Sequence, residues 1–143
     1  NGGSTTGATG SSVQVTGTGR RGGRATWTHV PLSVALPGTG TYIINAAIRS
    51  VLVMSSGIGA ISFKLVNATA GTDIANSIRV GPYGVSLTQN VATANLFALV
   101  SIVGAATIKV QASCAAFGGT YSTTNVVSDS SLAKNQMHYV QIA

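Results

Sequence analysis

The stretch "TYIINAAIRSVLVM", residues 41–54, decides the fold class. Its even-numbered positions are apolar except for Ser50, whereas Asn45 and Arg49 fall on the odd-numbered side. Side chains of a β-strand point alternately to its two faces, so a repeat of two residues predicts a strand with one buried side. We therefore expect a long strand here, with these side chains in the core: Tyr42, Ile44, Ala46, Ile48, Leu52 and Met54.

The same alternation recurs in two further stretches. It places Ser62 and Lys64 on the outer side of one strand, and Lys109, Gln111 and Ser113 on the outer side of another. Both patterns predict half-buried strands. The side chains expected on the inner sides are Ile61, Phe63, Leu65, Ile108, Val110, Ala112 and Cys114.

The stretch "NLFALVSIV", residues 95–103, is apolar on both faces. A strand of this kind is covered on one side by the core and on the other by a second layer. We expect that second layer to be a neighbouring subunit.

Turn signals separate these runs, and no stretch has a helical repeat. Strands at this spacing predict an all-β sandwich, and the closing "NQMHYVQIA" predicts a last strand that finishes inside the sheet. The expected turns are "LPGTG" at 36–40, "SSGIG" at 55–59, "NATAGTD" at 67–73, "GPYG" at 81–84, "VGAAT" at 103–107 and "FGGT" at 117–120.

The composition indicates one domain that associates with copies of itself. Only 7% of the 143 residues are charged, against about 25% in an average domain. The formal net charge of +6 arises from bases that are mostly scattered, a pattern typical of solvated strand faces. A chain with so few charges lacks what keeps a monomer soluble, so we expect homo-oligomerisation.

The cysteine count, the hydropathy and the N-terminal residues argue against a disulfide-linked chain, a membrane span and a signal peptide. The single cysteine, Cys114, allows no disulfide within the chain and is expected to be a small buried hydrophobe. No apolar run reaches the about 18 residues of a membrane span. The chain opens at Asn1 without a signal-peptide pattern, so we expect a fragment or processed product of a longer protein.

Residues 1–24 form a glycine-rich arm before a head domain at residues 25–143. We expect a flexible or partner-ordered arm with one short strand at "SSVQVTG". Two triplets with leading glycines, Gly7-Ala8-Thr9 and Gly10-Ser11-Ser12, are either the end of a collagen-like shaft or chance in a glycine-rich segment.

The stretch "GTGRRGGR", residues 17–24, has the glycine spacing of a dinucleotide-binding loop. Such a loop needs a following helix and an acid about 20 residues later, but "RATWTHVPLSV" is strand-like and the first acid is Asp73. Arg20, Arg21 and Arg24 could instead track nucleic-acid phosphates. We favour a neck in which the glycines let the chain turn and the arginines contact carbonyls or acids of adjacent chains.

The stretch "LPGTGTYIINAAIRSV" resembles the C1q/TNF-like jelly-roll family, in which a Pro-Gly-x-Tyr turn leads into a long central strand. Here Pro37-Gly38 precedes Tyr42 with a two-residue insertion. The segment "ATIKVQASCAAFGGT" is similar to the family's penultimate strands, and "MHYVQIA" to its closing aromatic strand. The resemblance spans about residues 25–143. It implies a jelly-roll β-sandwich.

Bacteriophage fibres and vertex spikes often end in trimeric heads of this family, after glycine-rich or collagen-like shafts. The resemblance therefore implies a homotrimeric head of a spike or tail fibre, with an apolar axis and exposed loops. The acids that hold calcium in other members are missing here, so calcium binding is not implied.

The residues that chemistry would need are sparse. A glycosidase would have to use both Asp73 and Asp129, and a serine triad with His29 or His138 lacks the Gly-x-Ser-x-Gly turn. The histidines, Cys114 and the acids show no metal-ligand spacing. We therefore expect no enzyme activity, no metal and no cofactor.

Two tyrosines are the candidate contact residues. Tyr83 in "GPYG" and Tyr121 in "GGTYST" are expected on glycine-rich loops, where aromatics contact sugars or proteins, or else pack over sheet ends. Asn67-Ala68-Thr69 is a glycosylation sequon that has meaning only in a eukaryotic secretory pathway.

These observations and the resemblance predict a virion structural protein on the particle surface, the trimeric head of a spike or fibre that serves host attachment. We expect its N-terminal part to join other virion proteins, and a host cell-surface receptor to be a further partner. The first alternative is a capsid decoration or cement protein that uses the N-terminal arm as a strap. The second is a nucleic-acid-associated coat domain.

Overall fold

The computed structural model describes residues 2–6, 11–14, 17–18, 27–85, 89–128 and 135–143; of residues 11–13, 17–18 and 115–128 it describes the backbone. These residues form strands and turns, with no helix among them. The strands are β1 (Gly2–Thr6), β2 (Ser11–Gln14), β3 (Gly17–Thr18), β4 (Thr28–Leu36), β5 (Gly40–Asn67), β6 (Thr72–Asp73), β7 (Arg79–Val85), β8 (Gln89–Ile102), β9 (Ala106–Ser128) and β10 (Gln136–Gln141).

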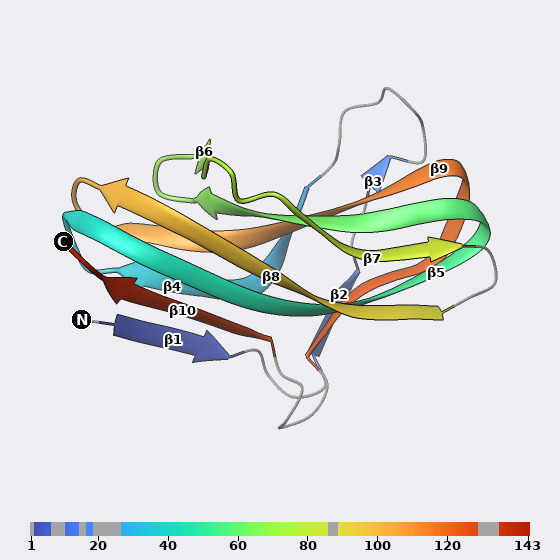
Figure 1. Ribbon diagram of the computed structural model, residues 1–143, viewed down its shortest axis with the longest axis horizontal. Helices are drawn as coiled ribbons and strands as arrows, with labels where there is room; N and C mark the ends of the chain where they lie inside the picture. Colours follow the sequence, from blue (N-terminus) through green and yellow to red (C-terminus); the bar gives the residue numbers. More distant parts are fainter. Residues whose placement is uncertain (1, 7–10, 15–16, 19–26, 86–88, 129–134) are drawn as a thin grey trace.

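All ten strands belong to one sheet that folds over on itself around β5. In Figure 1, β5 crosses the molecule, turns back at the right edge and returns, and β9 turns with it. Residues 40–53 of β5 pair with β8, and residues 58–67 pair with β7 and β6. On its opposite edge β5 pairs first with β10 and then with β9. The two halves of β5 thus belong to two layers, and the expected all-β jelly-roll sandwich is confirmed.

The bend in β5 is a series of bulges and not a turn. The pairing of β5 with β9 shifts register between Val53 and Ile58, and Gly57 lies there at φ 73°. This left-handed conformation suits glycine because a side chain would crowd the backbone. The expected turns at 55–59 and 117–120 are therefore wrong. A bulge needs the same permissive glycines as a turn but leaves the strand continuous.

The bulges explain why the buried positions of β5 change from even to odd numbers. Ile44 and Leu52 before the bend, and Phe63 and Leu65 after it, are each 0% exposed. One additional residue in a strand moves every later side chain to the other face. The expected inner faces of all three stretches are confirmed, and together they form one core with inner residues of β4, β8 and β10.

The turn before β5 is held by the tyrosine that follows it. The Tyr42 hydroxyl donates to the Gly38 carbonyl at 2.8 Å, while its ring is fully buried. Tyr139 of β10 packs edge-on against this ring, with the centroids 5.8 Å apart. The Pro37-Gly38 turn and the aromatic of the closing strand are thus joined in one cluster.

The closing strand β10 lies between β1 and β5, so the expectation that it finishes inside the sheet is confirmed. The described parts of the predicted arm pair with the same sheet: β1 with β10, and β2 and β3 with β9. The strand expected in "SSVQVTG" is found at Ser11–Gln14. The Thr5 hydroxyl also donates to the Ser33 carbonyl of β4 at 2.6 Å, which brings the two outer strands together.

Candidate subunit interface and polar pocket

One row of the outer face of the first layer is apolar across three strands. Ile43 of β5 stands opposite Leu99 of β8 on one side and opposite Val140 of β10 on the other. Leu99 is 60% exposed and Val140 51% exposed. Phe97 and Ile142 are exposed beside this row, one on β8 and one just after β10. We call these five residues the apolar face.

The apolar face exists because β8 is apolar on both sides, as its sequence predicted. Its even-numbered residues, such as Leu96, are in the core, while Phe97 and Leu99 face outward. Exposed apolar residues scattered singly need no explanation, but a contiguous patch indicates an interaction site.

The outer face of the second layer is polar over β4, β9 and the segment from β5 to β6, whereas Val80, Tyr83 and Val85 of β7 are exposed beside it. His29 of β4, Gln111 of β9 and Lys64 of β5 stand in one row across the three strands. The next row contains Lys109 of β9 and, across Val66, Asp73 of β6. The two layers therefore share one core, and the second layer carries a polar patch over β4, β9 and β6 that differs from the apolar face of the first layer.

Lys64 is held over this polar face by two partners. Its Nζ lies 2.9 Å from Asp73 Oδ2 and 4.3 Å from the centre of the Trp27 ring. The Lys64 side chain is only 9% exposed, whereas that of Asp73 is 63% exposed. A cation this buried needs a carboxylate and an aromatic face in compensation.

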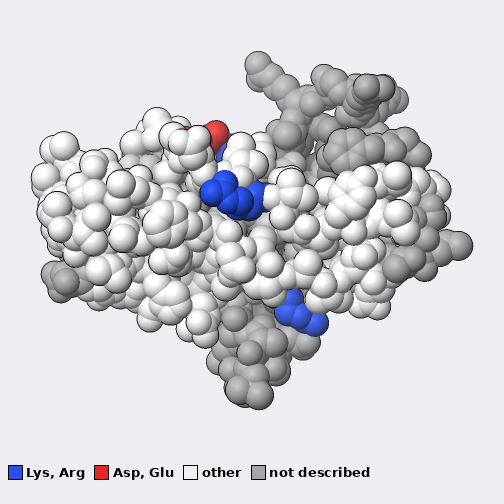
Figure 2. Space-filling model, viewed as in Figure 1, with Lys and Arg blue, Asp and Glu red and all other residues white. Residues whose placement is uncertain are grey.

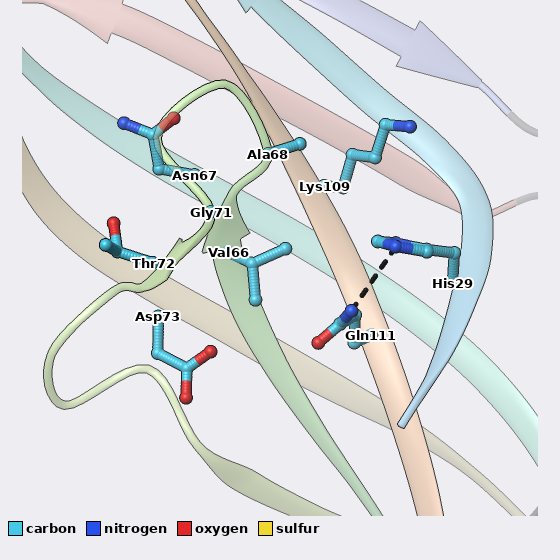
Figure 3. Close-up of a pocket in the computed structure, with 9 residues that line it drawn as sticks. All are labelled: His29, Val66, Asn67, Ala68, Gly71, Thr72, Asp73, Lys109 and Gln111. Atoms are coloured by element: carbon cyan, nitrogen blue, oxygen red, sulfur yellow. Dashed lines mark hydrogen bonds between the residues drawn. The ribbon is translucent and has the colours of Figure 1, made fainter. Parts of the chain in front are cut away.

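A pocket of about 320 Å³ opens on the same face. In Figure 3 the Lys109 amine and the His29 ring lie on one side of it, Asp73 and Thr72 lie on the other, and Val66 lies between them. The amide nitrogen of the Gln111 side chain lies 3.4 Å from Nε2 of the His29 ring. The pocket therefore combines β4, β9 and the segment from β5 to β6.

The segment 67–73 at the edge of the pocket is fixed by hydrogen bonds within the segment and to Thr107 of β9. The Ala68 amide donates to the Thr107 carbonyl at 2.9 Å, and the Thr107 amide donates to Thr69 Oγ1 at 3.0 Å. The Asn67 side chain accepts from the Ala70 amide at 3.0 Å, and Gly71 takes φ 71°. The turn expected at 67–73 is confirmed, and its sequon residues Asn67 and Thr69 have structural partners.

Charge is sparse over the surface. On the side shown in Figure 2, basic side chains form small separate patches on a mostly uncharged surface. Scattered bases were expected on solvated outer strand faces; Lys109 is found on such a face, whereas Lys64 faces outward but is buried beneath its partners. The ion pair of Lys64 with Asp73 was not expected; it forms because the turn at 67–73 brings Asp73 back over β5.

The structure changes the setting of the two predicted tyrosines. Tyr83 is 59% exposed but lies in β7, opposite Ala60, and not on a loop. The expected turn at 81–84 is thus wrong, since Gly81 and Gly84 are strand residues packed close to Phe63 and Leu52. Tyr121 also lies in a strand, with its backbone opposite Met54; its side chain is outside the described atoms. Their role as contact residues stays a prediction.

The other candidate residues fall into three groups. Cys114 is a buried thiol, as expected. His29 and His138 are both exposed, on opposite layers. Arg20, Arg21, Arg24 and Asp129 lie outside the described residues. Within the residues that the structure describes, no cluster of three or more metal-ligating side chains occurs, and no helix could cross a membrane.

Comparison with protein-family models and with curated protein sequences gives no match. Solved structures do match in fold. A structure of the Gt strain of infectious bursal disease virus superposes with a TM-score of 0.51 at 15% identity, covering 99% of this chain and 33% of that chain. A structure of the Gx strain gives 0.51 at 13% identity, covering 99% and 32%. The chain thus spans about a third of the length of the viral chains that it matches.

Proposed function

We propose that this chain is a structural protein of a virus particle, and that its jelly-roll domain associates with two further copies through the apolar face. The likeness in fold to chains of a solved virus supports the first part. The low charge of the chain supports the second, because a surface with few charges gains by being covered.

The observation that carries the proposal is the register of the apolar face. Leu99, Ile43 and Val140 stand side by side on three paired strands, so they form one continuous apolar row; Phe97 belongs to the next row, with Asn45 and His138. Burying apolar area of this kind yields about 25 cal/mol per Å². Subunit interfaces are typically apolar at their centre, with aromatic residues enriched, and Phe97 supplies such a residue.

The finer proposal is the trimeric head of a bacteriophage spike or tail fibre, related to the C1q/TNF-like family. Residues 25–143 would form the head and residues 1–24 the arm before it, whose described strands pair with β10 and β9 of the head; Arg20, Arg21 and Arg24 would contact adjacent chains. The cluster of Tyr42, Gly38 and Tyr139 supports this relation, because it joins the turn and the closing strand that carry the resemblance. A head of this kind would be displayed on the virion surface for host attachment.

The test is the solution mass of the full chain by light scattering. We expect three times the chain mass of 14.3 kDa. The Leu99→Asp variant should be monomeric, because association would bury its carboxylate among apolar side chains. Ile78→Asp is the matched control, since Ile78 is 56% exposed but lies before β7, away from the apolar face; this variant should remain trimeric.

Other masses decide between the alternatives. A dimer that Leu99→Asp dissociates would keep the interface and reject threefold symmetry. A monomeric wild-type chain would reject self-association and favour a cement protein whose arm binds a larger scaffold. Trimers that survive Leu99→Asp would place the interface elsewhere.

A further inference from the structure

Among the described residues, the pocket on the polar face has one cation, Lys109, without a counter-ion. Lys64 and Asp73 neutralise each other across 2.9 Å. Lys109, on the opposite side of the pocket in Figure 3, makes no ion pair within the described part of the chain. The charges of the described pocket residues and of Lys64 therefore sum to one positive charge, on Lys109, while the His29 ring is engaged as acceptor by the Gln111 amide. This side of the pocket suits one anionic group.

The other side of the pocket offers hydrogen bonds to hydroxyl groups. Lys64 occupies Asp73 Oδ2, which leaves Oδ1 of a mostly exposed side chain to accept. The Thr72 hydroxyl lies beside it, and the Gln111 amide lies between the two sides (Figure 3). Val66 presents methyl groups between these polar groups. A ligand with several hydroxyls, an apolar C–H face and one negative charge matches this arrangement.

We propose that the pocket binds an acidic saccharide, a sugar ring that carries one carboxylate. The carboxylate lies against Lys109, the hydroxyls bond to Asp73, Thr72 and Gln111, and the ring packs over Val66. A volume of about 320 Å³ is at the lower end of ligand pockets and suits a single ring. The idea that this saccharide is a host receptor rests on the attachment role proposed above. The binding of the saccharide to the pocket does not depend on that role.

The walls of the pocket are set before a ligand arrives. The hydrogen bonds of Ala68, Ala70 and Thr107 fix the segment 67–73, and the Trp27 ring and Asp73 hold Lys64. A preorganised site loses less conformational entropy on binding. Because carbohydrate ligands bind weakly, this smaller loss of entropy matters for their binding.

A second hollow, beside residues 73–79, lacks an available cation. Arg79 donates from one guanidinium nitrogen to the Asn76 carbonyl at 3.0 Å and to the Ile78 carbonyl at 2.7 Å. Its charge is thus engaged by its own segment. Arg79 therefore provides a matched control for the loss of one surface cation.

The experiment titrates the full chain with methyl β-D-glucuronide and with methyl β-D-glucoside, which differ in the carboxylate, and follows backbone amide NMR shifts. We expect the glucuronide to shift the amides of residues 66–73 and 109–111 with a dissociation constant of about 1 mM, as suits a ligand of this size. The glucoside should bind about tenfold more weakly, since it lacks the charge-assisted contact.

Lys109→Gln should remove that tenfold preference and leave glucoside binding unchanged, whereas Arg79→Gln should keep it. Equal binding of both sugars by the wild type, shifts outside the pocket, or no shifts at all would each overturn the proposal. Acetate and phosphate serve as further probes: binding of either as tight as the glucuronide would show a simple anion site. The solution mass of the same samples reports on the trimer separately, so failure of one proposal is distinguishable from failure of the other.

Discussion

The two halves of β5 pack the same core but face different surroundings. In the first half, Ile43 points outward between Leu99 and Val140. In the second half, Lys64 points outward between Gln111 and the Trp27 ring. The inward side chains of both halves are alike, and they are fully buried. The inner faces thus report how the domain folds, whereas the outer faces report what each layer meets.

The difference separates two kinds of surface on one small domain. The apolar face leaves several large side chains in water, an arrangement that covering would stabilise. The polar face has satisfied its buried cation internally and retains free polar groups around a pocket. One face is therefore suited to a permanent neighbour and the other to a reversible ligand.

The largest effect should come from the shared core. Ile44→Ala and Phe63→Ala remove buried side chains from the first and second halves of β5. We expect losses of about 2–5 and about 3–5 kcal/mol in the free energy of unfolding, because each leaves a cavity. Urea unfolding would be measured in the Leu99→Asp background, where association adds nothing to stability. A negligible loss for Ile44→Ala alone would break the comparison, since it would remove the first layer from the common core.

A medium effect is expected where the polar face is anchored. Lys64→Ala should lower the free energy of unfolding by about 1–3 kcal/mol, because it removes the contact with Trp27 and the ion pair with Asp73. Lys64→Met keeps most of the packing and should stay within about 1 kcal/mol of the wild type. Thermal unfolding compares the two variants. Equal losses for both would show that the charge, and not the packing of the side chain, holds this face.

The smallest effect concerns the bend that divides the two halves. Gly57→Ala should destabilise by about 1 kcal/mol, since φ 73° is unfavourable for a residue with a side chain. Gly38→Ala is the control, because an added Cβ there meets nothing within 4 Å; we expect no loss. Urea unfolding of both variants provides the measurement. If Gly57→Ala were as stable as Gly38→Ala, the left-handed glycine would not be what permits the bend.

Much of the fold could be predicted from the sequence, but the candidate site could not. Alternation correctly placed Tyr42, Phe63 and Val110 in the core and Lys109 outside, but it did not predict that Lys64 would be buried. It also correctly predicted that β8 is apolar on both faces. No pattern linked Lys109 to His29 or Lys64 to Asp73, because these pairs come from different strands and depend on which strands become neighbours.

Alternation is a local property, because neighbouring residues of any strand point to opposite faces. The sequence alone therefore determined the strand segments and their buried sides. It also determined that the buried positions change from even numbers up to Met54 to odd numbers from Ile61. Glycine permits both a turn and a bulge, and the choice at 55–59 and 117–120 depends on the partner strand. Because β5 and β9 pair along both sides of the bend, their glycines accommodate bulges in two continuous strands. That pairing, which only the tertiary structure decided, places the apolar face on one layer and the polar pocket on the other.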